Sequence, residues 1–196
     1  MNRTIITIIV SVIVTGGLVA YFYGGRPATT TPVVLSDGYA VENGKVYYIT
    51  LSPQRSDFEV KDADVATFEI PGDGWGKDAK NVFYLGFTTR PADASTPTID
   101  ALSFTSVAGT YFGKDNQAIY IPSFVYNPDG TGTYVYSVFP GADPATFVIV
   151  KLLMYAKDKS NVWYIAPGEG GPAREKMVGA NPAECTADNL KGCEAQ

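Results

Sequence analysis

Histidine is absent from all 196 residues of the chain, and cysteine occurs only twice. A chain without histidine has no Ser-His-Asp or Cys-His catalytic set, no His-ligated zinc or iron and no ordinary proton shuttle near neutral pH. The sequence therefore indicates no metal or other cofactor and does not favour an enzyme.

Positive charge is also scarce. The chain has 15 Lys and Arg against 20 Asp and Glu, which gives a net charge of -5, and no Lys/Arg cluster is visible. Phosphate binding needs such clusters, so nucleic acid is not an expected partner. The composition is 45% hydrophobic, 13% aromatic and 18% charged, which is typical of a globular, Tyr- and Phe-rich β protein.

One long uncharged run, Thr4 to Tyr23, precedes the rest of the chain. Its 20 residues are enough for a helix to span a hydrocarbon core of roughly 30 Å. With Arg3 before it and an acidic domain after it, we expect a signal anchor with a cytoplasmic amino terminus, although a long cleaved signal peptide is the alternative. The expected organisation is a cytoplasmic end at 1–3, a transmembrane helix at 4–23, a linker at 24–35, a repeat domain at 36–185 and a tail at 186–196.

The repeat domain carries one pattern four times. An aromatic residue opens each copy and a second aromatic closes it eight residues later. The opening residues are Tyr39, Trp75, Phe112 and Tyr155, and the closing residues are Tyr47, Phe83, Tyr120 and Trp163. We expect each copy to form a strand, a tight turn and a second strand.

A second motif follows each hairpin at a nearly fixed distance. Its first residue lies 17, 17, 23 and 18 residues after the closing aromatic. These residues are Asp64, Asp100, Asp143 and Asn181. Asp or Asn in this context is a good N-cap, so we expect a single helical turn at each position, followed by Phe68, Phe104 or Phe147 packed between successive hairpins. The hairpin motif and this second motif keep the same order and nearly the same spacing in all four copies, which indicates a true repeat.

Two of the hairpins, Asp158 to Tyr164 and Asp78 to Tyr84, together with the segment Gly141 to Phe147, resemble the DKNYY repeat family. The resemblance covers roughly Gly38 to Cys185. It implies a bacterial, often envelope-associated repeat domain and assigns no catalytic residues. The first copy departs from the pattern with Glu42 and Gly44, and the third departs with Ile121 in place of the second aromatic.

For the fold we expect an all-β array of tandem hairpins with short helical turns, after one N-terminal transmembrane helix. Four copies could close into a small propeller or remain an open stack. Cys185 occupies the position of the repeated Phe, and outside the cytoplasm we expect it to form a disulfide with Cys193 that caps the last copy.

The third copy contains extra residues between Tyr120 and Asp143, which predict an elongated hairpin. This insertion is the expected contact site for a partner. Its candidate residues are Asn127, Pro128, Asp129, Gly130, Tyr134 and Tyr136.

Three functional interpretations follow. The first is a single-pass protein of the bacterial cell membrane whose C-terminal domain, outside the cytoplasm, works as a protein-interaction or structural envelope module. The second is cell-wall or glycan binding through an exposed aromatic row, either Tyr47 and its equivalents or Tyr48 and its equivalents. The third, least favoured, is a hydrolase that pairs carboxylates such as Asp78 and Asp64, or a calcium site between copies. Repetition of the same Asp in every copy instead favours turn and cap roles.

Overall fold

The computed structural model describes residues 33–50, 56–151, 154–166 and 173–194. Within these ranges the protein is all-β, and the only helix is a short 3-10 turn, η1 (Leu190–Cys193). None of the described helices is long and apolar enough to cross a membrane. The predicted span at 4–23 lies outside the described residues.

Four sheets follow one another along the chain. In each, strands adjacent in sequence pair antiparallel, so every copy of the repeat supplies one sheet. The first sheet contains β1 (Val33–Ser36), β2 (Tyr39–Glu42), β3 (Lys45–Thr50) and β4 (Ser56–Glu59). The second contains β5 (Glu69–Gly72), β6 (Trp75–Lys77), β7 (Val82–Tyr84) and β8 (Phe87–Thr88).

The third sheet is built from β10 (Thr105–Ser106), β11 (Gly113–Lys114), β12 (Ile119–Tyr126) and β13 (Gly132–Val138). A fifth strand, β9 (Arg90–Pro91), joins its edge parallel to β13. The fourth sheet contains β14 (Val148–Lys151), β15 (Tyr155–Lys157), β16 (Val162–Ala166) and β17 (Ala173–Lys176).

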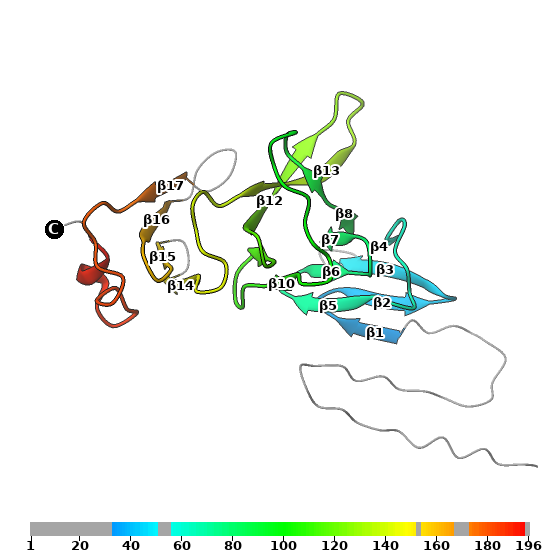
Figure 1. Cartoon of the computed structure of the whole chain (residues 1–196). Helices are drawn as coiled ribbons and strands as arrows, with labels where there is room; N and C mark the ends of the chain where they lie inside the picture. The colour runs from blue at the N-terminus through cyan, green and yellow to red at the C-terminus, as the bar shows by residue number, and fades with distance from the viewer. Residues whose placement is uncertain (1–32, 51–55, 152–153, 167–172, 195–196) are drawn as a thin grey trace, which may run out of the picture.

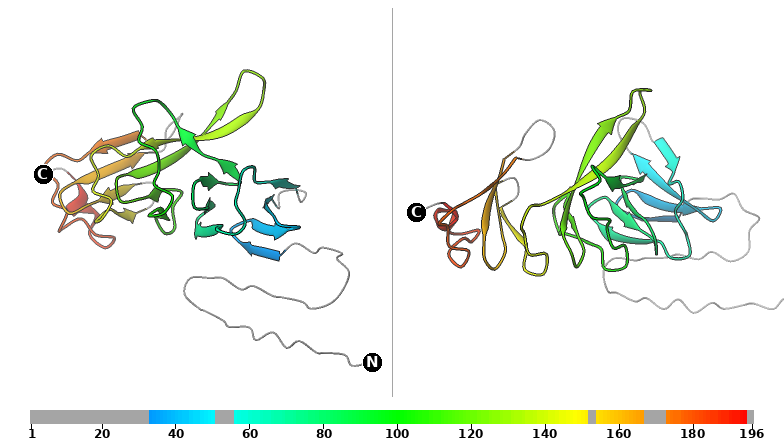
Figure 2. Two further views of the ribbon diagram at one scale, coloured as in Figure 1. Left: turned by 45° about the vertical axis from the view of Figure 1, so that its right-hand side comes forward. Right: turned by 45° about the horizontal axis from the view of Figure 1, so that its top comes forward.

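The sheets stack as an open array. Figure 1 shows the first sheet at one end of the molecule and the fourth at the other, and both views of Figure 2 keep them apart. Each junction has its own buried cluster: Tyr39 and Phe83 between the first two sheets, Trp75 and Tyr120 at the next, and Phe112 and Trp163 at the third. The core is therefore a series of layers between successive sheets.

Aromatic residues fill these layers because the strands alternate their faces. Trp75 pairs with Tyr84 on one face of the second sheet, and Gly76 pairs with Phe83 on the other. Phe68 lies against Gly76 on the first-sheet side, whereas Trp75 contacts Phe104 on the third-sheet side with ring centroids 4.9 Å apart. Aromatic pairs at such distances add about 0.5–1.5 kcal/mol each beyond their buried area.

The short turns expected after the cap residues are isolated single turns, such as Thr67 N to Asp64 O at 3.1 Å. Two other expectations from the sequence need correction. Strand β1 begins at Val33 and pairs Val34 with Ala40, so residues 33–35 belong to the first sheet and not to the linker. The tail is folded as far as buried Cys193, because the disulfide holds it against the last copy.

Candidate functional site

A buried aspartate in each of the second, third and fourth hairpins links its own copy to the copy before it. Asp78, Asp115 and Asp158 are 4–5% exposed. In Asp78, Oδ1 accepts hydrogen bonds from the backbone N–H groups of Lys80 and Asn81, both at 2.7 Å. The other oxygen, Oδ2, accepts from the backbone N–H of Asp64 in the preceding turn at 3.0 Å. One carboxylate thus closes its own hairpin and holds the turn before it.

The same contacts recur in the later copies. Asp115 Oδ2 accepts from Asp100 N at 2.8 Å, and Asp158 Oδ2 accepts from Asp143 N at 2.9 Å. Burial raises the pKa of the Asp158 carboxyl, but hydrogen bonds from the backbone amides of Asp143, Ser160 and Asn161 outweigh it and leave the pKa below its usual value.

The lysine just before each of these aspartates faces the following turn. Lys77 Nζ donates to Leu102 O at 3.3 Å, and Lys114 Nζ donates to Pro144 O at 3.0 Å. In the last copy Lys157 Nζ donates to both Pro182 O and Cys185 O, at 2.8 and 2.6 Å. Each Lys-Asp pair therefore links one hairpin to the turns on both sides of it.

The four residues predicted as caps make the expected type of local contact. Asp64 Oδ1 accepts from Ala66 N at 3.0 Å, and Asn181 Oδ1 accepts from Ala183 N at 3.0 Å. Asp100 and Asp143 bond in the same way to the amides two residues later. The repeated acids are thus engaged with backbone amides. Among the described residues, no group of three or more Cys, Asp or Glu is placed to hold a metal ion.

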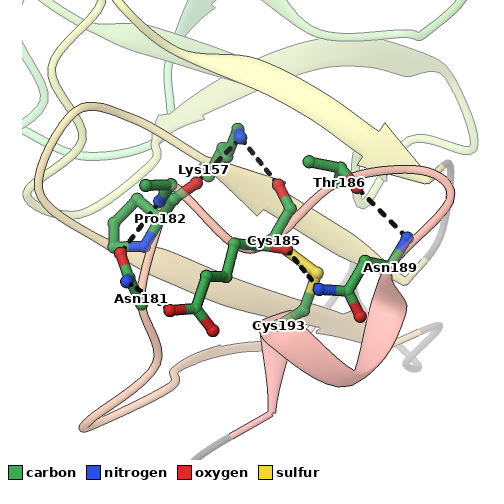
Figure 3. Close-up of a disulfide and its surroundings, with 9 residues drawn as sticks. Lys157, Asn181, Pro182, Cys185, Thr186, Asn189 and Cys193 are labelled. Carbon is green, nitrogen blue, oxygen red and sulfur yellow. Dashed lines mark hydrogen bonds between the residues drawn. A yellow bond between two sulfur atoms is a disulfide. The ribbon is translucent and has the colours of Figure 1, made fainter.

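The two ends of the array depart from this scheme. In the first copy a two-residue turn, Asn43 and Gly44, replaces the aspartate loop, with φ of 51° and 73°. These left-handed angles suit a type I′ hairpin turn. At the other end, Cys185 forms a disulfide with Cys193, confirming the predicted pair. Figure 3 shows this disulfide beside Lys157 and the turn at Asn181.

The insertion in the third copy forms a projecting hairpin, which we call the finger (residues 124–134). Its strand residues pair only with one another, from Phe124↔Tyr134 to Tyr126↔Gly132, and both views of Figure 2 show it extending from the array. Tyr126 is 81% exposed and Phe124 is 42% exposed.

The candidate contact residues fall in three environments. Pro128, Asp129 and Gly130 are exposed at the tip of the finger, where Asp129 Oδ1 accepts from Thr131 N at 2.9 Å. Asn127 is half-buried and Tyr134 packs on Phe124.

Tyr136 was wrongly predicted as a contact residue. It is 2% exposed, and its hydroxyl accepts a hydrogen bond from Ile99 N.

Neither aromatic row suggested by the sequence is exposed as a whole. Phe83, Tyr120 and Trp163 are buried, and Tyr48, Tyr84 and Tyr164 are half-buried. The structure instead places a continuous set of rings beside and along the finger, which we call the aromatic ridge. Successive centroids lie 5.0–6.2 Å apart, and its members are Phe58, Phe87, Phe124, Tyr126 and Tyr134. The alternation of strand faces in the sequence does not predict the aromatic ridge, because its rings come from three different sheets.

Among the described residues, a hollow of about 270 Å³ lies where Lys77 reaches toward Ala101 and Leu102. Its Lys77 is already bonded to Leu102 O and lies 3.4 Å from Glu69.

The antiparallel sheets are stacked, and the Lys and Asp of successive hairpins bond to the turns on either side of each hairpin. These features define a repeat protein. The DKNYY family model matches residues 39–167, and the chain belongs to the DKNYY family. This confirms the resemblance seen in the sequence. No curated protein and no solved structure matches the chain.

Proposed function

We propose that this protein is a membrane-anchored, extracytoplasmic module of the bacterial cell envelope that acts by contacting other proteins through its finger. The observation that carries the proposal is the finger itself. It is the one hairpin among the described copies that extends well beyond its sheet, and it exposes Tyr126 and Phe124 at its outer part. Tyr is a common anchor at protein interfaces because its ring is large, rigid and amphipathic.

The rest of the repeated chemistry supports an architectural role. The buried carboxylates of Asp78, Asp115 and Asp158 all accept from backbone amides of their own hairpin and of the turn before it, and Asp115 also accepts from the Tyr120 hydroxyl. A repeat array provides an extended surface without a reactive centre, and a membrane anchor would fix that surface close to its partners.

The test is photo-crosslinking in cells, with a photoreactive residue at position 124 of the full-length chain, which is 42% exposed and is kept when the finger is shortened. The expected result is a discrete protein adduct. A shortened finger, in which an Asn-Gly turn replaces residues 125–133 between the paired Phe124 and Tyr134, should abolish it. The matched control carries the photoreactive residue at Leu102, which is 77% exposed but lies in a turn of the array. An adduct at both positions, or one that survives shortening, would contradict the proposal.

Localisation needs its own test, because the predicted span lies outside the described residues. An outward-facing domain should be cleaved by protease added to spheroplasts, and the full-length chain should sediment with membranes. Protection from the protease would place the domain inside.

A second candidate function, glycan binding, is favoured by the aromatic ridge. Sugar rings stack on exposed aromatic faces, and the ridge ends in the exposed rings of Phe124 and Tyr126. Its other members, Phe58, Phe87 and Tyr134, are half-buried. Sedimentation of the full-length protein with purified cell wall tests it. Tyr126→Ala should lower the bound fraction, whereas Leu102→Ala should not. Equal binding by both variants would remove this candidate.

A further inference from the structure

The buried aspartate of the third copy has different hydrogen-bond donors from its counterparts. In the second copy, the asparagine three residues later brings its side-chain amide to the carboxylate, with Asn81 Nδ2 3.4 Å from Asp78 Oδ2. In the fourth copy, Asn161 Nδ2 lies 3.4 Å from both oxygens of Asp158. The third copy has Ala118 at this position, so its aspartate lacks the amide donor.

A tyrosine of strand β12 supplies the missing donor. Tyr120 stands where the second and fourth copies have Phe83 and Trp163, neither of which has a hydroxyl. It is 0% exposed, and its hydroxyl donates to Asp115 Oδ2 at 2.8 Å. Burial, followed by the bond to Asp115, raises the pKa of this hydroxyl above its ordinary value, so it remains a donor. A donor from the hairpin turn has thus been exchanged for one from the strand that continues into the finger.

The other strand of the finger is tied to the same turn. Tyr136 of β13 is 2% exposed, and its hydroxyl accepts from Ile99 N at 3.3 Å. The next amide along, Asp100 N, donates at 2.8 Å to the same Asp115 oxygen that accepts from Tyr120. Two consecutive amides of one turn therefore hold both strands, one directly and one through the aspartate.

These bonds lie where the finger leaves the array. Tyr120 precedes Phe124, the first residue of the finger, by four residues. Tyr136 follows Tyr134, the last residue of the finger, by two. Farther out, the finger rests on the second sheet through ring contacts, such as Phe87 with Tyr134 at 5.6 Å. Hydrogen bonds weaken steeply with angle, so bonds between buried groups restrict direction more tightly than ring packing does.

We propose that Tyr120 and Tyr136 are positioning residues for the finger: their buried hydroxyls fix the direction in which it projects and so present Tyr126 to a partner. The part that concerns the partner rests on the function proposed above. A finger held in one direction has less freedom to lose on binding, which favours association. Stacking itself does not need a donor on the strand, because the second and fourth copies use the asparagine amide instead.

The test measures the direction of the finger by pulsed electron paramagnetic resonance on the full-length protein in mild detergent. One spin label is placed at Thr133→Cys in the finger and the other at Lys80→Cys in the second hairpin. The native cysteines are buried and joined in a disulfide, so they take no label. The matched control pair, Lys80→Cys with Val178→Cys, lies within the array. Tyr120→Phe and Tyr136→Phe should each broaden the finger-to-array distance distribution and leave the control pair unchanged.

Two results of this measurement would overturn the proposal. The first is an unchanged finger distribution in both phenylalanine variants. The second is equal broadening of the control pair, because a loss of direction in the whole array would mean that the hydroxyls hold the stack and not the finger.

An exchange of donors separates positioning from stability. Ala118→Asn combined with Tyr120→Phe gives the third copy the donor arrangement of the second, with an amide beside Asp115 and no hydroxyl on β12. The unfolding midpoint should recover toward that of the native protein, whereas the finger distances should stay broad. Narrow finger distances in this double variant would contradict positioning by the strand. Tyr136→Phe leaves Asp115 and its donors unchanged, so it gives the same readout without the exchange.

Photo-crosslinking at position 124 connects positioning with the partner. Tyr120→Phe should lower the yield of the protein adduct by roughly threefold or more, since a loosened finger must be ordered on binding. An unchanged yield alongside broadened distances would overturn the part that concerns the partner. Absence of any adduct in the native protein would count against the proposed function alone, because the spin-label distances report positioning without a partner.

Discussion

Replacing Asp158 by asparagine should loosen the fourth sheet from the third while the rest of the array stays folded. The carboxylate is buried, and its Oδ1 accepts from Ser160 N and Asn161 N, each at 2.7 Å. Its Oδ2 accepts from Asp143 N at 2.9 Å. Asparagine has one acceptor oxygen, so its amide nitrogen must face either the hairpin amides or the amide of Asp143.

The expected loss of unfolding free energy follows from this loss of one acceptor oxygen. One buried N–H left without an acceptor costs about 1–3 kcal/mol, and the remaining bonds lose the extra strength of a charged acceptor, which adds about 1 kcal/mol. We therefore expect Asp158→Asn to lose about 2–4 kcal/mol of unfolding free energy. The matched control is Asp93→Asn, the same change at an exposed carboxylate whose four hydrogen bonds all go to Oδ1, an oxygen that asparagine keeps. Its loss should stay within about 1 kcal/mol.

The assay uses the two tryptophans, which lie in different sheets. Guanidinium unfolding of the full-length chain in mild detergent is followed by Trp163 fluorescence in a Trp75→Phe background, and by Trp75 fluorescence in a Trp163→Phe background. Stability in a repeat array is close to a sum over neighbouring units, so Asp158→Asn should shift the Trp163 transition more than the Trp75 transition. Equal shifts of the two transitions, or a loss no larger than that of Asp93→Asn, would refute the reasoning.

The stability difference between the native protein and Asp158→Asn should also depend on pH. The pKa of Asp158 lies below its ordinary value of 3.8 in the folded state, because the amide hydrogen bonds outweigh the effect of burial. The carboxylate therefore stabilises the fold above pH 3.8, and this contribution is lost as the pH falls through the lowered pKa. The stability gap between the native protein and Asp158→Asn should shrink in acid.

Three further predictions concern the packing, the cap and the alkaline limit. Gly113→Ala places a methyl group against the Phe104 ring and should cost about 1–3 kcal/mol in guanidinium unfolding; a loss under about 0.5 kcal/mol would contradict the packing described. Cys185→Ser should lower stability by about 2–3 kcal/mol, and reductant should then shift the Trp163 transition of the native protein but not of the variant. Burial raises the pKa of Tyr84 to about 12, so stability should fall between about pH 10 and about pH 12, less steeply in Tyr84→Phe.

The sequence predicted the features that repeat or lie close together in the chain. Hairpins, cap residues and the Cys185–Cys193 bond all depend on local spacing. The contact from Lys77 to Leu102 O spans 25 residues and joins two copies, and no local pattern encodes it. Strand β9 was missed for a related reason, because its pairing with β13 is parallel and only two residues long.

The error at Tyr136 shows where alternation fails. Tyr134 and Tyr136 lie two residues apart and therefore on one face of β13, yet Tyr134 packs in the finger and Tyr136 contacts Tyr120 in the core at 5.3 Å. A strand that passes from a stacked layer into a projecting hairpin changes its surroundings without changing its pattern. Exposure along such a strand is set by where the neighbouring sheet ends.

The adjacent Lys and Asp of a hairpin bond to turns on opposite sides of that hairpin. This indicates which features of the chain are shared by the repeats and which are specific to this protein. Asp78 holds the turn before its hairpin, and Lys77 holds the turn after it. Among the described residues, the first copy has no turn before it and carries Asn43-Gly44 in place of the aspartate loop. The last copy is followed by the Cys185–Cys193 disulfide, where the earlier copies are followed by another hairpin. The shared residues are thus accounted for by stacking, which any member with the same repeats requires. What distinguishes this chain lies in its departures from the repeat: the finger, the Asn43-Gly44 turn and the cap at Cys185.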